Sequence, residues 1–183
     1  MHASPQPNAA GWNNTDTTVT FEASDAFSGF AGSATEQVMF TTEGADQVAS
    51  ASFTDLAGNT ATASATVNID KTAPVLLGLP VACELSPPNH EMVDVATLRG
   101  VDGLSGVAGL AVTATSDEPD DGLGDGDASP DIAVDGGQVR LRAERSGTGR
   151  GRTYTISASA TDVAGNVARG SATCFVPHNV LPR

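Results

Sequence analysis

Two sequence patterns occur twice along this chain of 183 residues, in the same order each time. Residues 23–32 recur as residues 100–109, and residues 51–59 recur as residues 158–166. Self-similarity of this kind is the sequence signature of repeated structural units. We therefore expect two related modules in tandem, which the chain length also allows.

The two modules differ in the spacing between the patterns. Asp25 and Asp55 lie 30 positions apart, whereas Asp102 and Asp162 lie 60 positions apart. We assign the additional residues of the second module to an insert at 117–152, which is acidic first and basic afterwards. The predicted boundaries are a leader at 1–14, a first module at 15–72, a second module at 73–178 and a tail at 179–183.

Residues 18–23, 61–69 and 154–160 alternate apolar and polar side chains, as strands with one buried face do. Turn residues separate such runs, and no segment carries a sustained helical stripe. Residues 55–59 and 162–166 predict tight hairpins, because Asp accepts backbone N–H bonds and Gly adopts positive φ. The predicted fold class is all-β, with two tandem β-sandwich domains.

Two cysteines, Cys83 and Cys174, lie near the two ends of the second module. They are either buried free thiols or one disulfide that ties the first strand of the module to its last, and their positions favour the disulfide. The bond would close a loop of 91 residues, worth about 4–5 kcal/mol in the chain-entropy model. It would also indicate an oxidising compartment.

Three motifs in this order resemble tandem bacterial immunoglobulin-like modules of secreted and surface proteins. They are Asp-x-x-Ser-Gly at 25–29 and 102–106, Thr-Asp-x-Ala-Gly-Asn at 54–59 and 161–166, and Asp-Lys-Thr-Ala-Pro at 70–74. The second module also resembles the hyalin repeat, because residues 74–75 lead to Cys83 and residues 172–176 close the module around Cys174. The resemblance implies two immunoglobulin-like β-sandwich domains that act as extracellular spacers, adhesion units or accessory domains, and it carries no catalytic residues.

The charge balance excludes several classes of partner. The chain has 22 acidic and 9 basic residues, for a formal net charge of −13. A charge this negative repels nucleic acid and anionic lipid, whereas it makes cations plausible partners. No apolar run approaches the roughly 18 residues needed to span a membrane, so membrane insertion is not expected.

The first candidate calcium site lies where the two modules join. In a sandwich of this connectivity strands B and F end at the same pole, which should bring Asp25 near Asp55 and likewise Asp102 near Asp162. The first strand of the second module enters at that pole, so Asp70 of the linker should lie close to the second pair. Three converging carboxylates suit Ca²⁺, which prefers six to eight oxygen ligands, and would stiffen the linker. Alternatively, Asp55 and Asp162 only cap their hairpins and Asp70 is only solvated.

The second candidate calcium site is an acidic loop in the insert. Its candidate ligands are Asp117, Asp120, Asp121, Asp125, Asp127, Ser129 and Asp131. The last four recur at every second position, like the first ligands of an EF-hand loop. However, Pro130 and Gly136 stand where that loop needs Gly and Glu, so a complete EF-hand is excluded. A looser calcium loop and a simply solvated acidic loop both stay open.

The insert also contains most of the arginines of the chain. The residues are Arg140, Arg142, Arg145, Arg150 and Arg152. Because residues 139–144 alternate, the arginines of this segment should lie on an exposed strand face. They could bind an anionic glycan or a partner protein, form internal counter-ions for the acidic loop, or simply be solvated.

The sequence shows no catalytic constellation. It has no Gly-x-Ser-x-Gly elbow, phosphate loop or dinucleotide fingerprint, and too few nitrogen and sulfur ligands for zinc. We therefore expect a non-catalytic extracellular structural, adhesion or spacer module stabilised by calcium, whose partners are neighbouring domains of a larger secreted or surface protein. The alternative is a glycan- or protein-binding accessory module of a secreted enzyme that uses residues 117–152.

Overall fold

The computed structural model describes residues 1–120 and 129–178. It is all-β, with 56% strand and no helix among the residues described. The described part therefore contains no helix long and apolar enough to cross a membrane. The chain forms two compact units, and the first includes two turns that are distant in sequence from the rest of it. The first unit is Met1–Ala73, Gly103–Gly106 and Asp162–Asn166, and the second is Pro74–Asp102, Val107–Thr161 and the residues from Val167 on.

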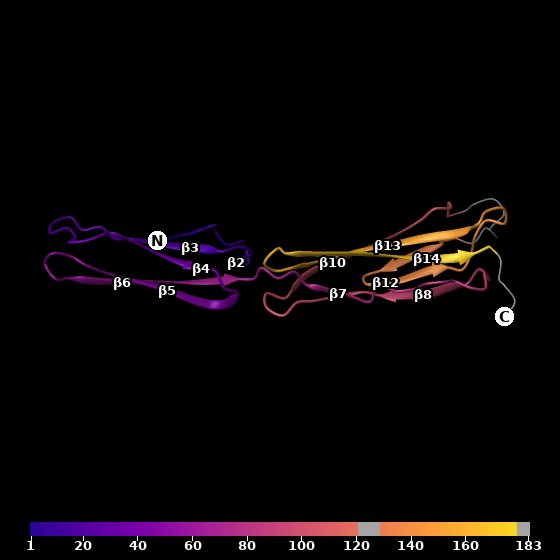
Figure 1. Ribbon diagram of the computed structural model, residues 1–183, viewed down its shortest axis with the longest axis horizontal. Helices are drawn as coiled ribbons and strands as arrows, with labels where there is room; N and C mark the ends of the chain where they lie inside the picture. The colour runs from indigo at the N-terminus through magenta and orange to yellow at the C-terminus, as the bar shows by residue number, and fades with distance from the viewer. Residues whose placement is uncertain (121–128, 179–183) are drawn as a thin grey trace. The chain divides into compact units, whose positions relative to one another are not determined.

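The first unit consists of two three-stranded sheets packed face to face (Figure 1). One sheet has the order β1-β3-β4, with β1 at His2–Ser4, β3 at Thr17–Glu22 and β4 at Thr35–Phe40. The other has the order β2-β6-β5, with β2 at Trp12–Asn13, β6 at Thr60–Ile69 and β5 at Gly44–Thr54. Neighbouring strands are antiparallel, except that β2 pairs with β6 in parallel.

The core of the first unit is small and made largely of alanine, valine and a few aromatic side chains. Phe21 on β3, Ile69 on β6 and Ala49 on β5 are each at most 1% exposed and belong to the same cluster. The predicted strand at 61–69 is confirmed, but its burial begins only near Ala65, since the residues before it are exposed. One end of this sandwich is therefore open.

Residues 1–14, predicted as a leader, are part of the first unit and contribute two short strands to it. β1 pairs with β3 over three residues, and Ala3 packs against the core. Asn13 on β2 is 5% exposed and donates from its side-chain amide to Pro5 O at 3.1 Å. These strands are too short to show a hydrophobic period in the sequence, which is why the pattern missed them.

The second unit has one sheet of order β10-β13-β14 facing one of order β11-β12-β8, and a short ribbon β7-β9. The bounds are β7 Val75–Leu77, β8 Met92–Thr97, β9 Arg99–Val101, β10 Val107–Ser116, β11 Ile132–Asp135, β12 Gln138–Arg142, β13 Gly151–Asp162 and β14 Val167–Pro177. Its core combines Leu141 of β12 with Tyr154 and Ile156 of β13 and Val176 of β14, each 0% exposed. The strand predicted at 154–160 lies within β13.

The additional residues of the second unit build two strands and do not form a separate insert at 117–152. β12 pairs with β8 in the way that β4 pairs with β3, and the β13–β14 hairpin matches the β5–β6 hairpin. β10 and β11 have no counterpart in the first unit. As a result β13 has β10 on one side and β14 on the other, whereas β5 lies at the edge of its sheet.

The predicted disulfide between Cys83 and Cys174 is confirmed, with Cα atoms 4.5 Å apart. Cys174 lies on β14, whereas Cys83 follows β7 and is not part of the first strand. Phe175 N donates to Cys83 O at 2.9 Å, and Leu85 N donates to Phe175 O at 2.9 Å. The disulfide therefore fastens the segment between β7 and β8 to the last strand, and it fits an oxidising compartment.

Replacing both Cys83 and Cys174 by Ala should lower the free energy of unfolding of the second unit by about 2–5 kcal/mol, because the loop is no longer closed in the unfolded chain. Urea unfolding followed by the near-ultraviolet circular dichroism of Tyr154, the only tyrosine and fully buried in this unit, measures the change. The fluorescence of Trp12, the only tryptophan, monitors the first unit and should keep its midpoint. Identical Tyr154 transitions in the two proteins would contradict the prediction.

Candidate cation site

Two tight turns with the same sequence pattern share the bonds between their first aspartate and their last asparagine. In the turn Asp162–Asn166, the Oδ1 atom of Asp162 accepts bonds from Gly165 N and Asn166 N, both at 2.7 Å. The Nδ2 atom of Asn166 donates to Asp162 Oδ2 at 2.8 Å. Gly165 has φ +100°, a region in which a side chain is strained, so glycine is required there. In the copy at residues 55–59, Asn59 makes the same two bonds to Asp55, but the second N–H on Asp55 Oδ1 comes from Ala57; Gly58 has φ +91°.

Each of these turns lies beside a second turn from the first sequence pattern. Leu56 N donates to Gly29 O, and Val163 N donates to Gly106 O, each at 2.9 Å. We call residues 25–29 with 55–59 the first turn pair, and residues 102–106 with 162–166 the second turn pair. The turns that carry Asp25 and Asp55 therefore lie side by side, as do the turns that carry Asp102 and Asp162. This pairing of turns agrees with the predicted proximity of each pair of aspartates.

Asp70 is hydrogen-bonded to both turns of the second turn pair and is 0% exposed. Its Oδ2 atom accepts a bond from Ser105 N at 3.0 Å, and its Oδ1 atom accepts one from Thr72 N at 3.1 Å. Its backbone carbonyl accepts a bond from Asn166 Nδ2 at 2.7 Å. The sequence reasoning missed the roles of Ser105 and Asn166, although both are part of the repeated patterns.

Three carboxylates converge at this position. One oxygen atom each of Asp70, Asp102 and Asp162 lies within 4.8 Å of the others. Asp70 and Asp162 are buried, at 0% and 2% exposed, and Asp102 is half-buried. Each pair of charges at such a distance repels by about 3–4 kcal/mol at an effective dielectric constant of about 20. The structure thus brings together the three aspartates that the sequence placed near the linker, and their oxygen atoms suit a hard cation such as Ca²⁺.

The carboxylates of the first turn pair are held by hydrogen bonds and are exposed or half-buried. Asp25 Oδ1 accepts bonds from Gly29 N at 2.7 Å and Phe27 N at 3.0 Å, and these N–H groups lower its pKa. The side-chain amide and backbone N–H of Asn59 lower the pKa of Asp55 in the same way. Both residues therefore cap their turns in the ionised form.

The acidic loop is only partly within the described residues, since Asp121, Asp125 and Asp127 lie outside them. Asp120 accepts bonds from Ser129 Oγ at 2.8 Å and from Asp131 N at 2.6 Å, which lower its pKa. Asp117 is bound elsewhere, since its Oδ1 atom accepts a bond from Thr153 N at 2.7 Å. Asp117 and Asp120 of the predicted calcium loop are therefore bound by protein donors, and Ser129 is itself one of these donors.

Asp131 is 1% exposed and is paired with arginine. Its Oδ2 atom lies 2.5 Å from Nη1 of Arg152, and its Oδ1 atom lies 3.4 Å from Nε of Arg142. Burial raises the pKa of Asp131, and the charge of Arg152 opposes this shift. Several interpretations of the acidic loop and the arginines were left open. The described residues support the one in which the arginines are internal counter-ions of the acidic side chains.

The arginines predicted to form an exposed binding face are dispersed by the fold. Arg152 is 0% exposed, because it lies on the same face of β13 as Tyr154 and Ile156, and its Nε atom donates to Ser116 Oγ at 2.7 Å. That position leaves no surface of Arg152 for a ligand. A period of two, applied from residue 156 backwards, would have predicted its burial.

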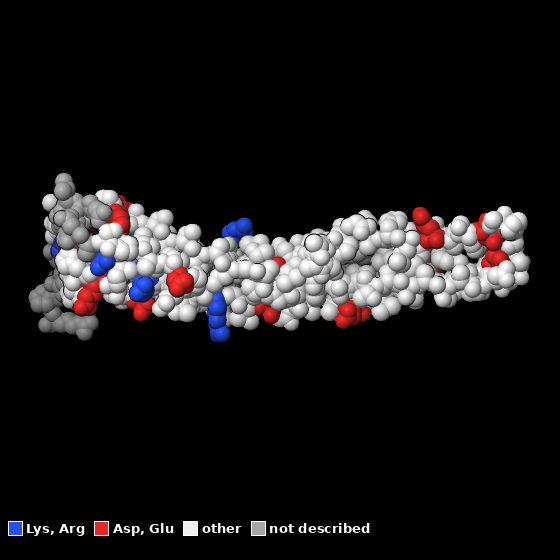
Figure 2. Space-filling model, turned by 180° about the vertical axis from the view of Figure 1, so that it is seen from behind, with Lys and Arg blue, Asp and Glu red and all other residues white. Residues whose placement is uncertain are grey.

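Only part of the arginine set remains at the surface. Arg142 donates to His90 O at 2.8 Å and to Pro130 O at 2.9 Å, and Arg145 donates to His178 O at 3.1 Å. Arg140 and Arg150 are exposed. On the face drawn in Figure 2, basic and acidic side chains are interspersed on the second unit, and the first unit shows acidic ones.

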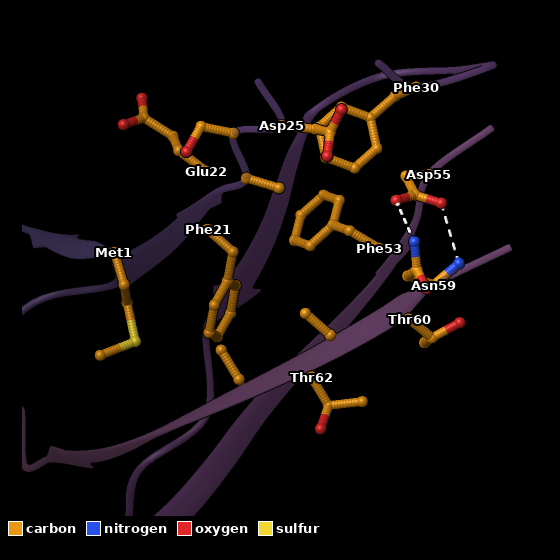
Figure 3. A pocket seen from close by; sticks show the side chains of 14 residues that line it. Met1, Phe21, Glu22, Asp25, Phe30, Phe53, Asp55, Asn59, Thr60 and Thr62 are labelled. Atoms are coloured by element: carbon orange, nitrogen blue, oxygen red, sulfur yellow. Dashed lines mark hydrogen bonds between the residues drawn. The ribbon is translucent and has the colours of Figure 1, made fainter. Parts of the chain in front are cut away.

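The first unit also contains a pocket of about 340 Å³ at its open end (Figure 3). Its apolar wall includes Phe21, Phe30 and Phe53, and the rings of Phe30 and Phe53 meet edge to face with centroids 6.4 Å apart. Asp25 and Asp55 lie at one side of the pocket, so it adjoins the first turn pair. Sequence patterns did not reveal this pocket.

No protein-family model matches the chain, and a search of curated proteins finds no match either.

Replacing Arg152 by Met should lower the free energy of unfolding of the second unit by about 3–5 kcal/mol, because it leaves the buried Asp131 carboxylate without its closest cation. Replacing the exposed Arg150 by Met is the matched control and should change it by less than about 0.5 kcal/mol. Urea unfolding monitored at Tyr154 measures both. Equal effects of the two substitutions would show that the ion pair is not required.

Proposed function

We propose that this chain is a non-catalytic structural or spacer part of a larger extracellular protein, built from two immunoglobulin-like modules and stabilised by Ca²⁺. The observation that carries the proposal is the convergence of Asp70, Asp102 and Asp162, with oxygen atoms within 4.8 Å of one another. On this proposal the partners of the chain are neighbouring domains of the larger protein, and the bound cation stabilises the folded chain.

The strand order of the second unit supports the immunoglobulin-like assignment. A constant-type immunoglobulin domain has strands A, B, E and D in one sheet and C, F and G in the other. In chain order β7, β8 with β9, β10, β11, β12, β13 and β14 occupy the positions A to G, and their pairing follows the same two sets. Tyr154, near the start of β13, donates from its hydroxyl to Arg142 O upstream at 3.0 Å, as a tyrosine corner does. The first unit has the same pairing without the strands C and D.

The chemistry of the aspartate cluster supports calcium. Its ligand atoms are all carboxylate oxygens, which hard divalent cations prefer, and the carbonyls of the two turns and water could complete the coordination. Repulsion between the carboxylates destabilises the folded chain unless a cation offsets it. Because Asp70 and two turns distant in sequence supply the ligands, a bound ion would hold these three segments together.

The alternative role, binding of a glycan or protein through residues 117–152, has less support. Arg152 and Asp131 neutralise each other inside the second unit, and Arg142 is bound to backbone carbonyls. Arg140 and Arg150 are what remains exposed of the predicted binding set, apart from the half-buried Arg145. The disulfide, by contrast, agrees with the extracellular part of the main proposal.

Calcium at about 100 times its dissociation constant should raise the free energy of unfolding by about 2.7 kcal/mol, since it binds the folded chain alone. Thermal melts in calcium and in chelator, monitored by the fluorescence of Trp12 in the first unit, measure the effect. Asp102→Asn removes one ligand charge and should abolish the difference between the two conditions.

Asp135→Asn is the matched control, because Asp135 is exposed on β11 and outside the aspartate cluster. It should keep the full calcium response. Melting temperatures that are the same in calcium and in chelator for the unmodified chain would overturn the calcium part of the proposal.

A further inference from the structure

The two turn pairs have the same sequence patterns and the same hydrogen bond between their turns, but their side chains differ in how far they are exposed. Phe27 in the first turn pair is 100% exposed, whereas Leu104 at the matching position of the second is 40% exposed. Ala57 is exposed, whereas its counterpart Ala164 is 5% exposed. Leu56, beside Ala57, is 64% exposed. Adjacent exposed Phe and Leu side chains are typical of a surface that another element covers.

The second turn pair shows what such a covering element looks like. Asp70 is bound there by Ser105 N and by Asn166 Nδ2. The matching donors in the first turn pair are Ser28 N and Asn59 Nδ2, because each lies at the same place in its repeated pattern. The first turn pair therefore presents the same two donors in the same type of turn.

The residues that follow Asp70 form β7 of the second unit. β7 pairs antiparallel with β9, with Val75 opposite Val101, Leu76 opposite Gly100 and Leu77 opposite Arg99. Leu76 packs against the core of that unit. A Cβ atom placed on Gly170 would lie 3.2 Å from the Leu76 side chain, so Leu76 lies directly against β14.

The matching residues of the first unit line the pocket of Figure 3. Residues 22–24 take the place of residues 99–101, 77 positions later, and all three line the pocket. Ala63 on β6 takes the place of Gly170 on β14 and also lines it. The pocket therefore lies where the second unit holds Leu76, and its Phe21, Phe30 and Phe53 wall suits an aliphatic side chain (Figure 3).

We propose that this end of the first unit is a docking site for an extended segment of another module of the same kind, with the sequence type Asp-x-Thr-x-Pro-Val-Leu. The Asp of the segment binds the first turn pair beside Asp25 and Asp55. The Val-Leu portion adds as a strand antiparallel to residues 22–24, and the Leu side chain enters the pocket. Strand addition of this kind gains backbone hydrogen bonds at a sheet edge and selectivity from the pocket.

The docking does not depend on the calcium proposal, because the hydrogen-bond donors and the pocket act without a metal. An incoming carboxylate does meet the charges of Asp25 and Asp55, so a cation should strengthen the docking as it would at Asp70. Experiments in chelator and in calcium therefore separate the two proposals.

The test uses an extended chain in which a second copy of residues 68–78 is placed directly before His2. The copied Gly78 then takes the place of Met1. In this chain the added Asp70 precedes Asp25 by 32 positions, the same separation that Asp70 has from Asp102. The tether gives the segment a high effective concentration at the site. Hydrogen–deuterium exchange then measures the protection of residues 22–30 and 55–59, with residues 139–158 of the second unit as the internal reference.

We expect exchange over 22–30 and 55–59 to be at least about tenfold slower than in the 183-residue chain, with the reference segment unchanged. Leu76→Thr in the added copy should abolish the slowing, because a polar side chain then faces the apolar pocket. Val75→Thr in the added copy is the matched control and should retain it, because Val75 is 58% exposed on β7.

Slowing in chelator supports docking without a metal, and slowing in calcium alone supports docking together with a cation at the first turn pair. Unchanged exchange in both conditions would overturn the proposal and leave the calcium response of the Asp70 cluster untouched. Equal loss of protection with Leu76→Thr and Val75→Thr would also overturn it, because the pocket would then have no part in the binding.

Discussion

The fold depends on one interaction that occurs at both hairpins, the acceptance of backbone N–H bonds by the first aspartate of the Asp-x-Ala-Gly-Asn turn. At Asp162 these bonds close the β13–β14 hairpin and orient Asn166, whose amide then reaches the backbone carbonyl of Asp70. The same carboxylate therefore serves the turn and the aspartate cluster. Since it is 2% exposed, it has to be satisfied by N–H groups or by a cation in every state of the folded chain.

The sequence was sufficient where a short local pattern determines the geometry. The repeated hairpins and the approach of Asp70 to Asp102 and Asp162 follow from motifs of a few residues. The disulfide follows from the positions of the two cysteines near the ends of the second module. The patterns did not predict β1, β2, β10 and β11, because these strands are short or lack a counterpart in the other module. Pairing between distant strands, such as β2 with β6, is determined by tertiary packing, and no local period records it.

The arginines show that the burial of a single side chain is also hard to predict when it depends on tertiary packing. Alternation predicted that the arginines of residues 139–144 face solvent, and Arg140 does. Arg152 stands at the start of β13, on the face that carries Tyr154, and its guanidinium lies 4.8 Å from the centre of that ring. A charged residue on a buried face needs a partner of opposite charge. For Arg152 this partner is Asp131, 21 positions earlier, and it can be recognised only once the two segments are placed side by side in the fold.

The aspartates discussed above lie in three kinds of environment that differ in what balances the charge. Turn aspartates such as Asp25 and Asp55 are balanced by backbone and amide N–H groups, which lower their pKa values. Asp131 is balanced by a buried guanidinium. At Asp70 and Asp162 the bonds to N–H groups stabilise single carboxylates but leave the repulsion among these two and Asp102, which a positive charge between them would offset. This difference, rather than the net charge of the chain, is the physical reason to look for calcium at that cluster.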